Sequence, residues 1–274
     1  MPRVACAMLA ALLAAQADAV TSQEPARQIT SASQQSAQSA QLQALIQAGL
    51  AHERAGDFAA AAEAYRKALQ LAPKSAVAHD RLGFTLGQQG DTAGAVEEFR
   101  KAVALDPALF DGQYHLGATL WWTKQPEEAR RALEAAVRLR PSDPEARYYL
   151  ALTLKQTGDP DRAIDELQRV VREEPDLNVA RMQLGVALRE AGDLDGAIEQ
   201  LQAAVEREPR SIEARNNLGL ALSQRGRAEE AIRVLRALVA DEPTFATARL
   251  NLGSTLMQKG DLDGAVAVYR ELVA

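Results

Sequence analysis

Cysteine, aromatic side chains and an excess of either charge are all scarce in this 274-residue sequence. Cys6 is the only cysteine, so the chain cannot form an internal disulfide or a cysteine cluster for a metal. Phe, Trp and Tyr make up 4% of the residues, so any local gathering of them departs from the background. The formal net charge of −6 is modest and both signs are interspersed, which excludes the strongly basic character expected of a protein that binds nucleic acid or anionic lipid.

The N-terminus has the pattern of a secretory signal peptide. Arg3 supplies the positive start, residues 4–15 are small and apolar, and Ala17-Asp18-Ala19 matches a cleavage site. The apolar run is shorter than the roughly 20 residues that span a bilayer. We therefore expect a periplasmic or secreted protein that begins near Val20, has lost Cys6 and has no integral membrane segment after cleavage. A disordered alanine-rich start is the alternative.

The next segment is rich in Ser, Gln and Ala and has too little apolar surface to offset the entropy lost on ordering. We therefore predict three parts of the chain: a signal peptide at 1–19, a disordered tether at 20–41, and a folded region at 42–274.

The folded region repeats itself every 34 residues. Three rows of residues recur with this step, one of proline, one of glycine and one of alanine: Pro73, Pro107, Pro141, Pro175, Pro209 and Pro243; Gly49, Gly83, Gly117, Gly185, Gly219 and Gly253, with Ala151 in the fourth place; and Ala61, Ala95, Ala129, Ala163, Ala197, Ala231 and Ala265. A fixed period of this length indicates an all-α solenoid of helix–turn–helix units.

Residues 178–211 show how the sequence specifies one unit. Gly192 can end the first helix in the left-handed conformation, Asp193 can cap the second, and Pro209 stops it. Gly185 is small where the two helices should approach. The apolar stripes predicted for the two helices are Ala180, Leu184, Ala187, Leu188 and Ala191, then Ala197, Ile198, Leu201, Ala204 and Val205.

This pattern resembles the tetratricopeptide repeat (TPR) family, in the form of an exported bacterial-type protein. Seven copies follow one another without insertion: 42–75, 76–109, 110–143, 144–177, 178–211, 212–245 and an incomplete 246–274. The resemblance implies a right-handed superhelical solenoid in which the first helix of each repeat lines a concave groove. It also implies a module that binds proteins or peptides.

Two features depart from the family pattern. The third repeat has Lys124-Gln125-Pro126 in place of the Gly-Asp turn, so Lys124 must close a helix at a cost of about 1 kcal/mol if it becomes left-handed. The last repeat stops inside its second helix, where we expect four apolar side chains to be partly bare: Val266, Tyr269, Leu272 and Val273. Self-association through this end and a longer parent protein are both open interpretations.

The sequence shows no catalytic chemistry. His52, His79 and His115 form no pair at metal-binding spacing on one helix face. Nucleophile elbows, P-loops and dinucleotide-binding glycine motifs are absent. We therefore expect a protein that is not an enzyme, with no catalytic residue, no metal and no cofactor.

A regular row of arginines has two interpretations. Arg147, Arg181, Arg215 and Arg249 share the fourth position of their repeats, and Glu174, Glu208 and Glu242 stand seven residues before the last three. The row is either a ladder for an acidic partner or a set of stems that cover the helix seam, with heads paired to those acids. The second interpretation is favoured.

Aromatic residues gather in repeats two to four. In the family, positions 2, 5, 9 and 12 of a repeat face the groove. Transferred to this sequence, the resemblance implies a binding surface made of Asp80, Phe84, Tyr114, Trp121, Tyr148 and Lys155, with Trp122 at its edge. These rings either anchor a partner or fill gaps between helices. The asparagines of the family's carboxylate clamp are missing, so that activity is not implied.

The first hypothesis is therefore an exported, non-enzymatic scaffold that binds a protein or peptide in its groove and does not bind nucleic acid. Two alternatives remain at this stage. One is a repeat segment of a larger enzyme, such as a glycosyltransferase, and the other is a self-assembling scaffold.

Overall fold

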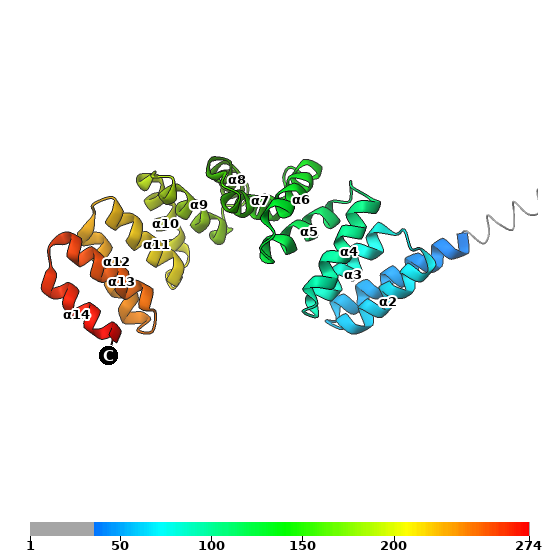
Figure 1. Ribbon diagram of the computed structural model, residues 1–274, viewed down its shortest axis with the longest axis horizontal. Coiled ribbons are helices and arrows are strands. Elements are labelled where there is room, and N and C mark those ends of the chain that lie inside the picture. The colour runs from blue at the N-terminus through cyan, green and yellow to red at the C-terminus, as the bar shows by residue number, and fades with distance from the viewer. Residues whose placement is uncertain (1–35, 274) are drawn as a thin grey trace, which may run out of the picture. The chain divides into compact units, whose positions relative to one another are not determined.

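The computed structural model describes residues 36–273, which consist of helices joined by short turns (Figure 1). The predicted signal peptide and residues 20–35 of the predicted tether lie outside this range. Residues 36–54 form one helix, so the tether prediction is wrong for 36–41. The amide of Gln38 donates a hydrogen bond of 3.2 Å to the carbonyl of Leu71, which ties this added turn to the first repeat.

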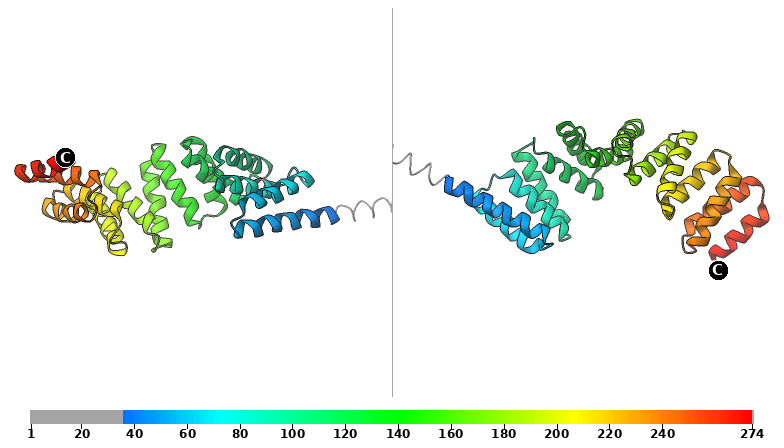
Figure 2. Two further views of the ribbon diagram at one scale, coloured as in Figure 1. Left: turned by 90° about the horizontal axis from the view of Figure 1, so that it is seen from below. Right: turned by 180° about the vertical axis from the view of Figure 1, so that it is seen from behind.

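After this helix, the chain alternates between the first and second helices of successive repeats, which confirms the all-α prediction. Within a repeat the two helices lie side by side, as α3 does with α4 and α9 with α10 (Figure 2). No helix in residues 36–273 is long and apolar enough to cross a membrane. The helices are α2 (Phe58–Leu71), α3 (Ala76–Gln88), α4 (Thr92–Leu105), α5 (Phe110–Trp122), α6 (Pro126–Leu139), α7 (Pro144–Gln156), α8 (Pro160–Glu173), α9 (Asn178–Glu190), α10 (Leu194–Arg207), α11 (Ile212–Gln224), α12 (Ala228–Asp241), α13 (Ala246–Lys259) and α14 (Leu262–Val273).

The chain divides into two compact units, residues 1–112 and 113–274. The described part of the first unit contains the helix at 36–54 and α2 to α4. The second unit contains most of α5 and all of α6 to α14.

The turn between the two helices of a repeat has the same backbone geometry in every described repeat. Its left-handed residue is a glycine in six cases: Gly56, Gly90, Gly158, Gly192, Gly226 and Gly260. Lys124 takes the same conformation, with φ 61°, and is the one residue other than glycine with positive φ in the described range. The prediction for the third repeat is thus confirmed. The aspartate after the glycine caps the second helix in four repeats, at Asp57, Asp91, Asp193 and Asp261.

The helix pairs are held by close approach at the small residues. A Cβ atom at Gly185 would lie 2.6 Å from Cγ of Leu201, so a larger residue there would push α9 away from α10. The predicted stripes of this repeat are buried, with two exceptions. Ala191 is exposed because it caps the end of α9, beyond the contact with α10, and Val205 is only partly buried.

The arginine row covers the helix seam, as favoured above, but its predicted acid partners are wrong. Arg147 donates a hydrogen bond of 2.6 Å to the carbonyl of Pro141 and pairs with Glu166 on α8. Arg181 contacts the Pro175 carbonyl and Gln200, both at 3.1 Å. Each of these two arginines binds the proline carbonyl at the start of the repeat junction and an acceptor on the second helix of its own repeat. Arg181 therefore does not pair with the glutamate predicted from the sequence.

The other two arginines of this row also pair with acids on the second helices of their own repeats. Arg215 pairs with Asp241 at 2.8 Å and Arg249 with Glu271 at 3.8 Å. His79, at the same position of the second repeat, lies 2.6 Å from Glu98 and 3.1 Å from the Pro73 carbonyl. In repeats two and four to seven, a polar residue at the fourth position therefore ties the first helix to the second helix of the same repeat.

The last helix has the exposure expected from its sequence. On α14, Val266 is exposed, while Tyr269 and Leu272 are partly exposed. The side chain of Val273 lies outside what the structure describes. Tyr269 packs against a core that includes Leu235, Leu252 and Leu256.

Candidate functional site

The seven predicted site residues fall in two units. Asp80 and Phe84 lie on α3 of the first unit, whereas Tyr114, Trp121, Trp122, Tyr148 and Lys155 lie on α5 and α7 in the second. Asp80 was expected on a surface, but only 1% of it is exposed. The Arg81 guanidinium lies 4.0 Å from its carboxylate and supplies the opposite charge that a buried carboxylate needs. Phe84 is partly exposed. Because the other five predicted residues lie in the second unit, the candidate site is described there.

The rings of the second unit form one cluster centred on Tyr149. The ring of Tyr149 meets those of Trp121, Tyr148 and Tyr114 edge-on, with centroid distances of 5.5, 5.6 and 6.1 Å. The ring centroids of Trp122 and Trp121 are 6.2 Å apart. Edge-to-face contacts at these distances stabilise ring pairs beyond the area that they bury. We call this set of five rings, Tyr114, Trp121, Trp122, Tyr148 and Tyr149, the aromatic cluster.

Sequence reasoning missed Tyr149 as a site residue because its repeat position lies outside the family's groove stripe. The available signal was its place beside Tyr148 in a chain with few aromatic residues. The planes of the two rings lie at 73° to each other, and their centroids are 5.6 Å apart. Tyr149 connects the rings of α5 to those of α7.

Burial changes the acidity of the tyrosines. Desolvation raises the pKa of Tyr114 to about 12, and the neighbouring Tyr149, Glu145 and Asp143 act in the same direction. Desolvation and Tyr149 also raise the pKa of Tyr148. Both hydroxyls are therefore neutral at physiological pH and can donate or accept hydrogen bonds.

Trp122 is the most exposed residue of the cluster. With 72% of its surface accessible, it lies at position 13 of its repeat. In each of the other six repeats this position is exposed and polar, occupied by Arg54, Gln88, Gln156, Glu190, Gln224 and Gln258. The fold therefore does not require an apolar side chain here. The sequence had placed Trp122 at the edge and Trp121 at the centre, but Trp121 is the more buried of the two.

Trp121 contacts one cation in addition to the rings of the cluster. The ammonium of Lys124 lies 5.7 Å from the centroid of its ring, within the range of a cation–π interaction. Its indole N–H is buried and has no acceptor among the described residues. Trp121 thus supports the cluster mainly through ring contacts.

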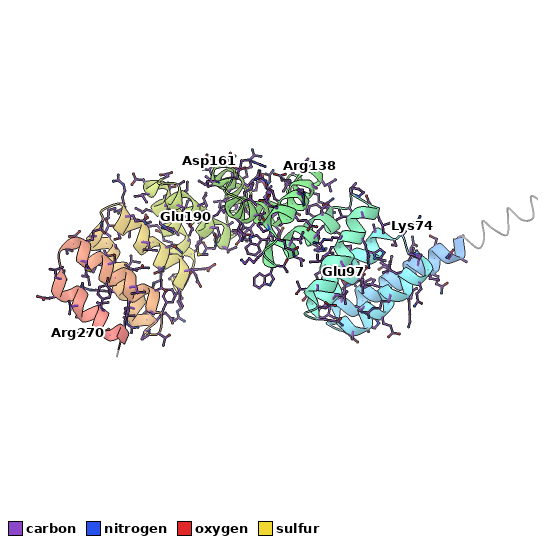
Figure 3. The ribbon with its side chains drawn as sticks, in the orientation of Figure 1. Lys74, Glu97, Arg138, Asp161, Glu190 and Arg270 are labelled. Atoms are coloured by element: carbon purple, nitrogen blue, oxygen red, sulfur yellow. The ribbon has the colours of Figure 1, made fainter. Side chains whose placement is uncertain are left out.

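Two cations, Lys155 and Arg189, hold position 12 of the fourth and fifth repeats, the position that Trp121 holds in the third. The ammonium of Lys155 on α7 lies 3.0 Å from a carboxylate oxygen of Glu190, which Figure 3 labels at the end of α9. The guanidinium of Arg189 lies 3.9 Å from the other oxygen of the same carboxylate. The Nε atom of Arg189 is buried and has no hydrogen-bond partner in the described part of the chain. Lys155 and Arg189 therefore share one acid.

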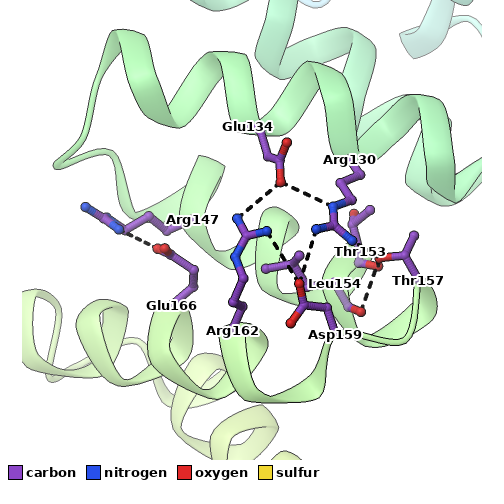
Figure 4. Close-up of polar contacts among 9 residues, drawn as sticks. All are labelled: Arg130, Glu134, Arg147, Thr153, Leu154, Thr157, Asp159, Arg162 and Glu166. Carbon is purple, nitrogen blue, oxygen red and sulfur yellow. Dashed lines mark hydrogen bonds and ion pairs between the residues drawn. The ribbon is translucent and has the colours of Figure 1, made fainter.

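An ion-pair network links the second helices of repeats three and four (Figure 4). Glu134 on α6 accepts hydrogen bonds from Arg130 and Arg162, at 3.2 and 3.1 Å. Asp159 also binds both arginines, at 3.1 and 3.4 Å. Asp159 occupies the capping position of α8 but makes no cap hydrogen bond, because its carboxylate is engaged by these two guanidinium groups. The network joins repeats three and four, which carry the rings.

Over residues 36–273, no three His, Cys, Asp or Glu side chains gather where they could hold a metal ion. His79, one of the three histidines considered above, is engaged in the helix seam. The site that remains is a surface of rings and charges.

Family models described as tetratricopeptide repeat match most of the folded region, at residues 42–75, 76–109, 124–187, 182–244 and 222–274. The chain belongs to the tetratricopeptide repeat family. No curated protein sequence matches this TPR chain.

Several solved TPR structures are similar to this protein. YrrB, described as a TPR protein with an unusual peptide-binding site, is 26% identical, with a TM-score of 0.63 over 68% of this chain and 96% of its own. MamA is 28% identical, with a TM-score of 0.54 over 59% of this chain and 94% of its own. PilF of Pseudomonas aeruginosa is 21% identical, with a TM-score of 0.66 over 81% of this chain and 99% of its own. At that identity, the likeness to PilF concerns the fold alone.

Proposed function

We propose that this TPR protein is a non-enzymatic scaffold that binds a protein or peptide through the aromatic cluster, and that it acts outside the cytoplasm after its signal peptide is removed. The family supports an interaction scaffold in general. The specific location rests on one observation, the exposure of Trp122.

A largely exposed tryptophan is unfavourable in water unless a partner covers it, because burying apolar surface gains about 25 cal/mol per Å². At Trp122 the other repeats show that a polar residue satisfies the fold equally well. Trp and Tyr are also the residue types that most often carry binding energy at protein interfaces. Trp122 and the partly exposed Tyr148 therefore make the best anchor on this surface.

The chain is convenient to test because Trp121 and Trp122 are its only two tryptophans. Intrinsic tryptophan fluorescence consequently reports on the aromatic cluster alone. Peptides selected from a displayed random library on the full chain should shift this fluorescence on binding. Trp122→Ala should weaken their binding by about 30-fold, the equivalent of the 2 kcal/mol typical of an interface anchor.

Gln224→Ala is the matched control, because Gln224 is exposed at the same repeat position in the sixth repeat. Its affinity should equal that of the unmodified chain. Both variants should melt at the same temperature, since neither side chain is buried. Selected peptides that bind the Trp122→Ala chain as tightly as the unmodified chain would refute this location.

A further inference from the structure

The geometry points to an acidic peptide segment with one large apolar side chain as the occupant of this surface. The apolar side chain packs on Trp122 and Tyr148, and the acidic side chain pairs with Arg189 and Lys155. This inference rests on the proposed function and adds the chemistry of the partner.

Arg189 is the first argument for a carboxylate. Its side chain is only 16% exposed, and its buried Nε atom has no hydrogen-bond partner within residues 36–273. Its single ion pair, at 3.9 Å to Glu190, is longer than the 2.7–3.2 Å of a hydrogen bond. A guanidinium group has five donors in a fork that matches a carboxylate. A partner carboxylate would pair with a terminal nitrogen of Arg189 more closely than Glu190 does.

The local charge is the second argument. Lys155 and Arg189 are balanced by one carboxylate, that of Glu190, and Lys124 adds a further positive charge over the Trp121 ring. The chain as a whole carries a net charge of −6, whereas this group of three cations and one carboxylate has an excess of positive charge. Such a local field attracts and orients an acidic segment.

The two acids that act on Tyr114 lie far from Lys155. Glu145 and Asp143, which act on Tyr114, lie at the first turn of α7 and just before it. Lys155 follows Glu145 by ten residues, about 15 Å along the helix axis at 1.5 Å per residue. The positive charge therefore lies at one end of the ring surface and the negative charge at the other.

The arrangement also predicts a spacing in the partner. Trp122 ends α5, and Lys155 and Arg189 lie one residue before the ends of α7 and α9, so the ring and the cations lie at the same end of successive first helices. Packed helices lie about 8–10 Å apart, and an extended chain advances about 3.3–3.6 Å per residue. One to two helix spacings correspond to about three to six residues between the apolar and acidic side chains of the partner.

The test uses a random dodecapeptide library displayed on phage, selected on the full chain with the Trp122→Ala chain as competitor. Enriched peptides should carry Asp or Glu three to six residues from an aromatic or large aliphatic residue, and their affinity should fall as salt rises. Arg189→Gln, which keeps the stem length, should weaken them at least tenfold.

Glu190→Gln separates binding from a structural role. The Glu190 carboxylate competes with the partner for Lys155 and Arg189, so its removal should tighten acidic peptides about threefold or more. If the three charges only hold α7 to α9, both substitutions should weaken binding together. Arg225→Gln, in the exposed Arg225–Asp195 pair, should change nothing.

The outcomes distinguish the two proposals. Peptides that need Trp122 but are neutral or basic, or that bind the Arg189→Gln chain as tightly as the unmodified chain, would overturn the acidic partner. The proposed binding site at the aromatic cluster would still stand. A selection that yields no Trp122-dependent peptide overturns the proposed site and the acidic partner together.

Discussion

Lys124 closes the turn after α5 and places its ammonium near the ring of Trp121. The Lys124 ammonium lies 5.7 Å from the centroid of the Trp121 ring, and its backbone has φ 61°, where the corresponding turns have glycine. A non-glycine residue in this conformation costs about 1–2 kcal/mol, whereas an exposed cation–π contact returns about 0.5–1 kcal/mol. The turn beside the aromatic cluster therefore carries strain that the others avoid.

Replacing Lys124 by glycine should relieve this strain. We expect Lys124→Gly to raise the free energy of unfolding by about 0.5 kcal/mol, because the relieved strain slightly exceeds the lost contact with Trp121. Urea denaturation followed by circular dichroism measures this change. Gly158→Ala, at the same turn position with φ 79°, is the converse control and should destabilise by about 1 kcal/mol. A loss of stability in Lys124→Gly would contradict the assignment of strain.

Arg147 should be far more important for stability than an exposed arginine. Its side chain is 7% exposed, pairs with Glu166 and donates to the Pro141 carbonyl. Arg147→Ala leaves a partly buried carboxylate and a carbonyl without their donor, so we expect a loss of about 3 kcal/mol. Arg225→Ala breaks a pair whose partners are 50% and 72% exposed, and should cost less than about 1 kcal/mol. Similar losses in the two variants would mean that the seam contact is not structural.

Tyr114 should make the protein lose stability in alkaline solution. Burial raises its pKa in the folded state to about 12, against about 10 in the unfolded chain. Between these values the unfolded chain releases the phenolic proton first, so the free energy of unfolding falls as pH rises. The contribution is complete below pH 10 and is lost as pH rises through 12.

Tyr114→Phe removes this titration and retains most of the ring. The decline in stability between about pH 9.5 and 11.5 should therefore be shallower in Tyr114→Phe than in the unmodified chain. Denaturation curves at both pH values measure the difference. Because the pKa of Tyr148 is also raised, Tyr148→Phe should show a change of the same sign. Parallel curves for Tyr114→Phe and the unmodified chain would show that Tyr114 titrates normally.

Export can be checked independently of binding. The signal-peptide pattern predicts that protein recovered outside the cytoplasm begins near Val20. Intact mass spectrometry should then show a chain shortened by the signal peptide and lacking Cys6. Substituting Ala17 and Ala19 by large residues should block processing, with the full-length mass as the result. Recovery of an unprocessed chain beginning at Met1 from the unmodified gene would disprove the prediction.

The repeat architecture could be predicted from the sequence because its determinants are local. A glycine at the turn is needed for a left-handed residue, an aspartate after it caps the next helix, and a small residue such as Gly185 lets two helices meet. Each of these requirements acts within one repeat and recurs with the period of 34 residues. Even the exception at Lys124 followed from the missing glycine.

The tertiary structure decided what each side chain meets in neighbouring elements. The position of Arg147 in its repeat placed it on the seam, but only packing showed that Pro141 and Glu166 are its partners. The same holds for Asp80, which is buried, and for Tyr149, which joins the rings. The helical period specifies the direction of a side chain from its axis, whereas its neighbours depend on distances between helices that the chain's local pattern does not contain.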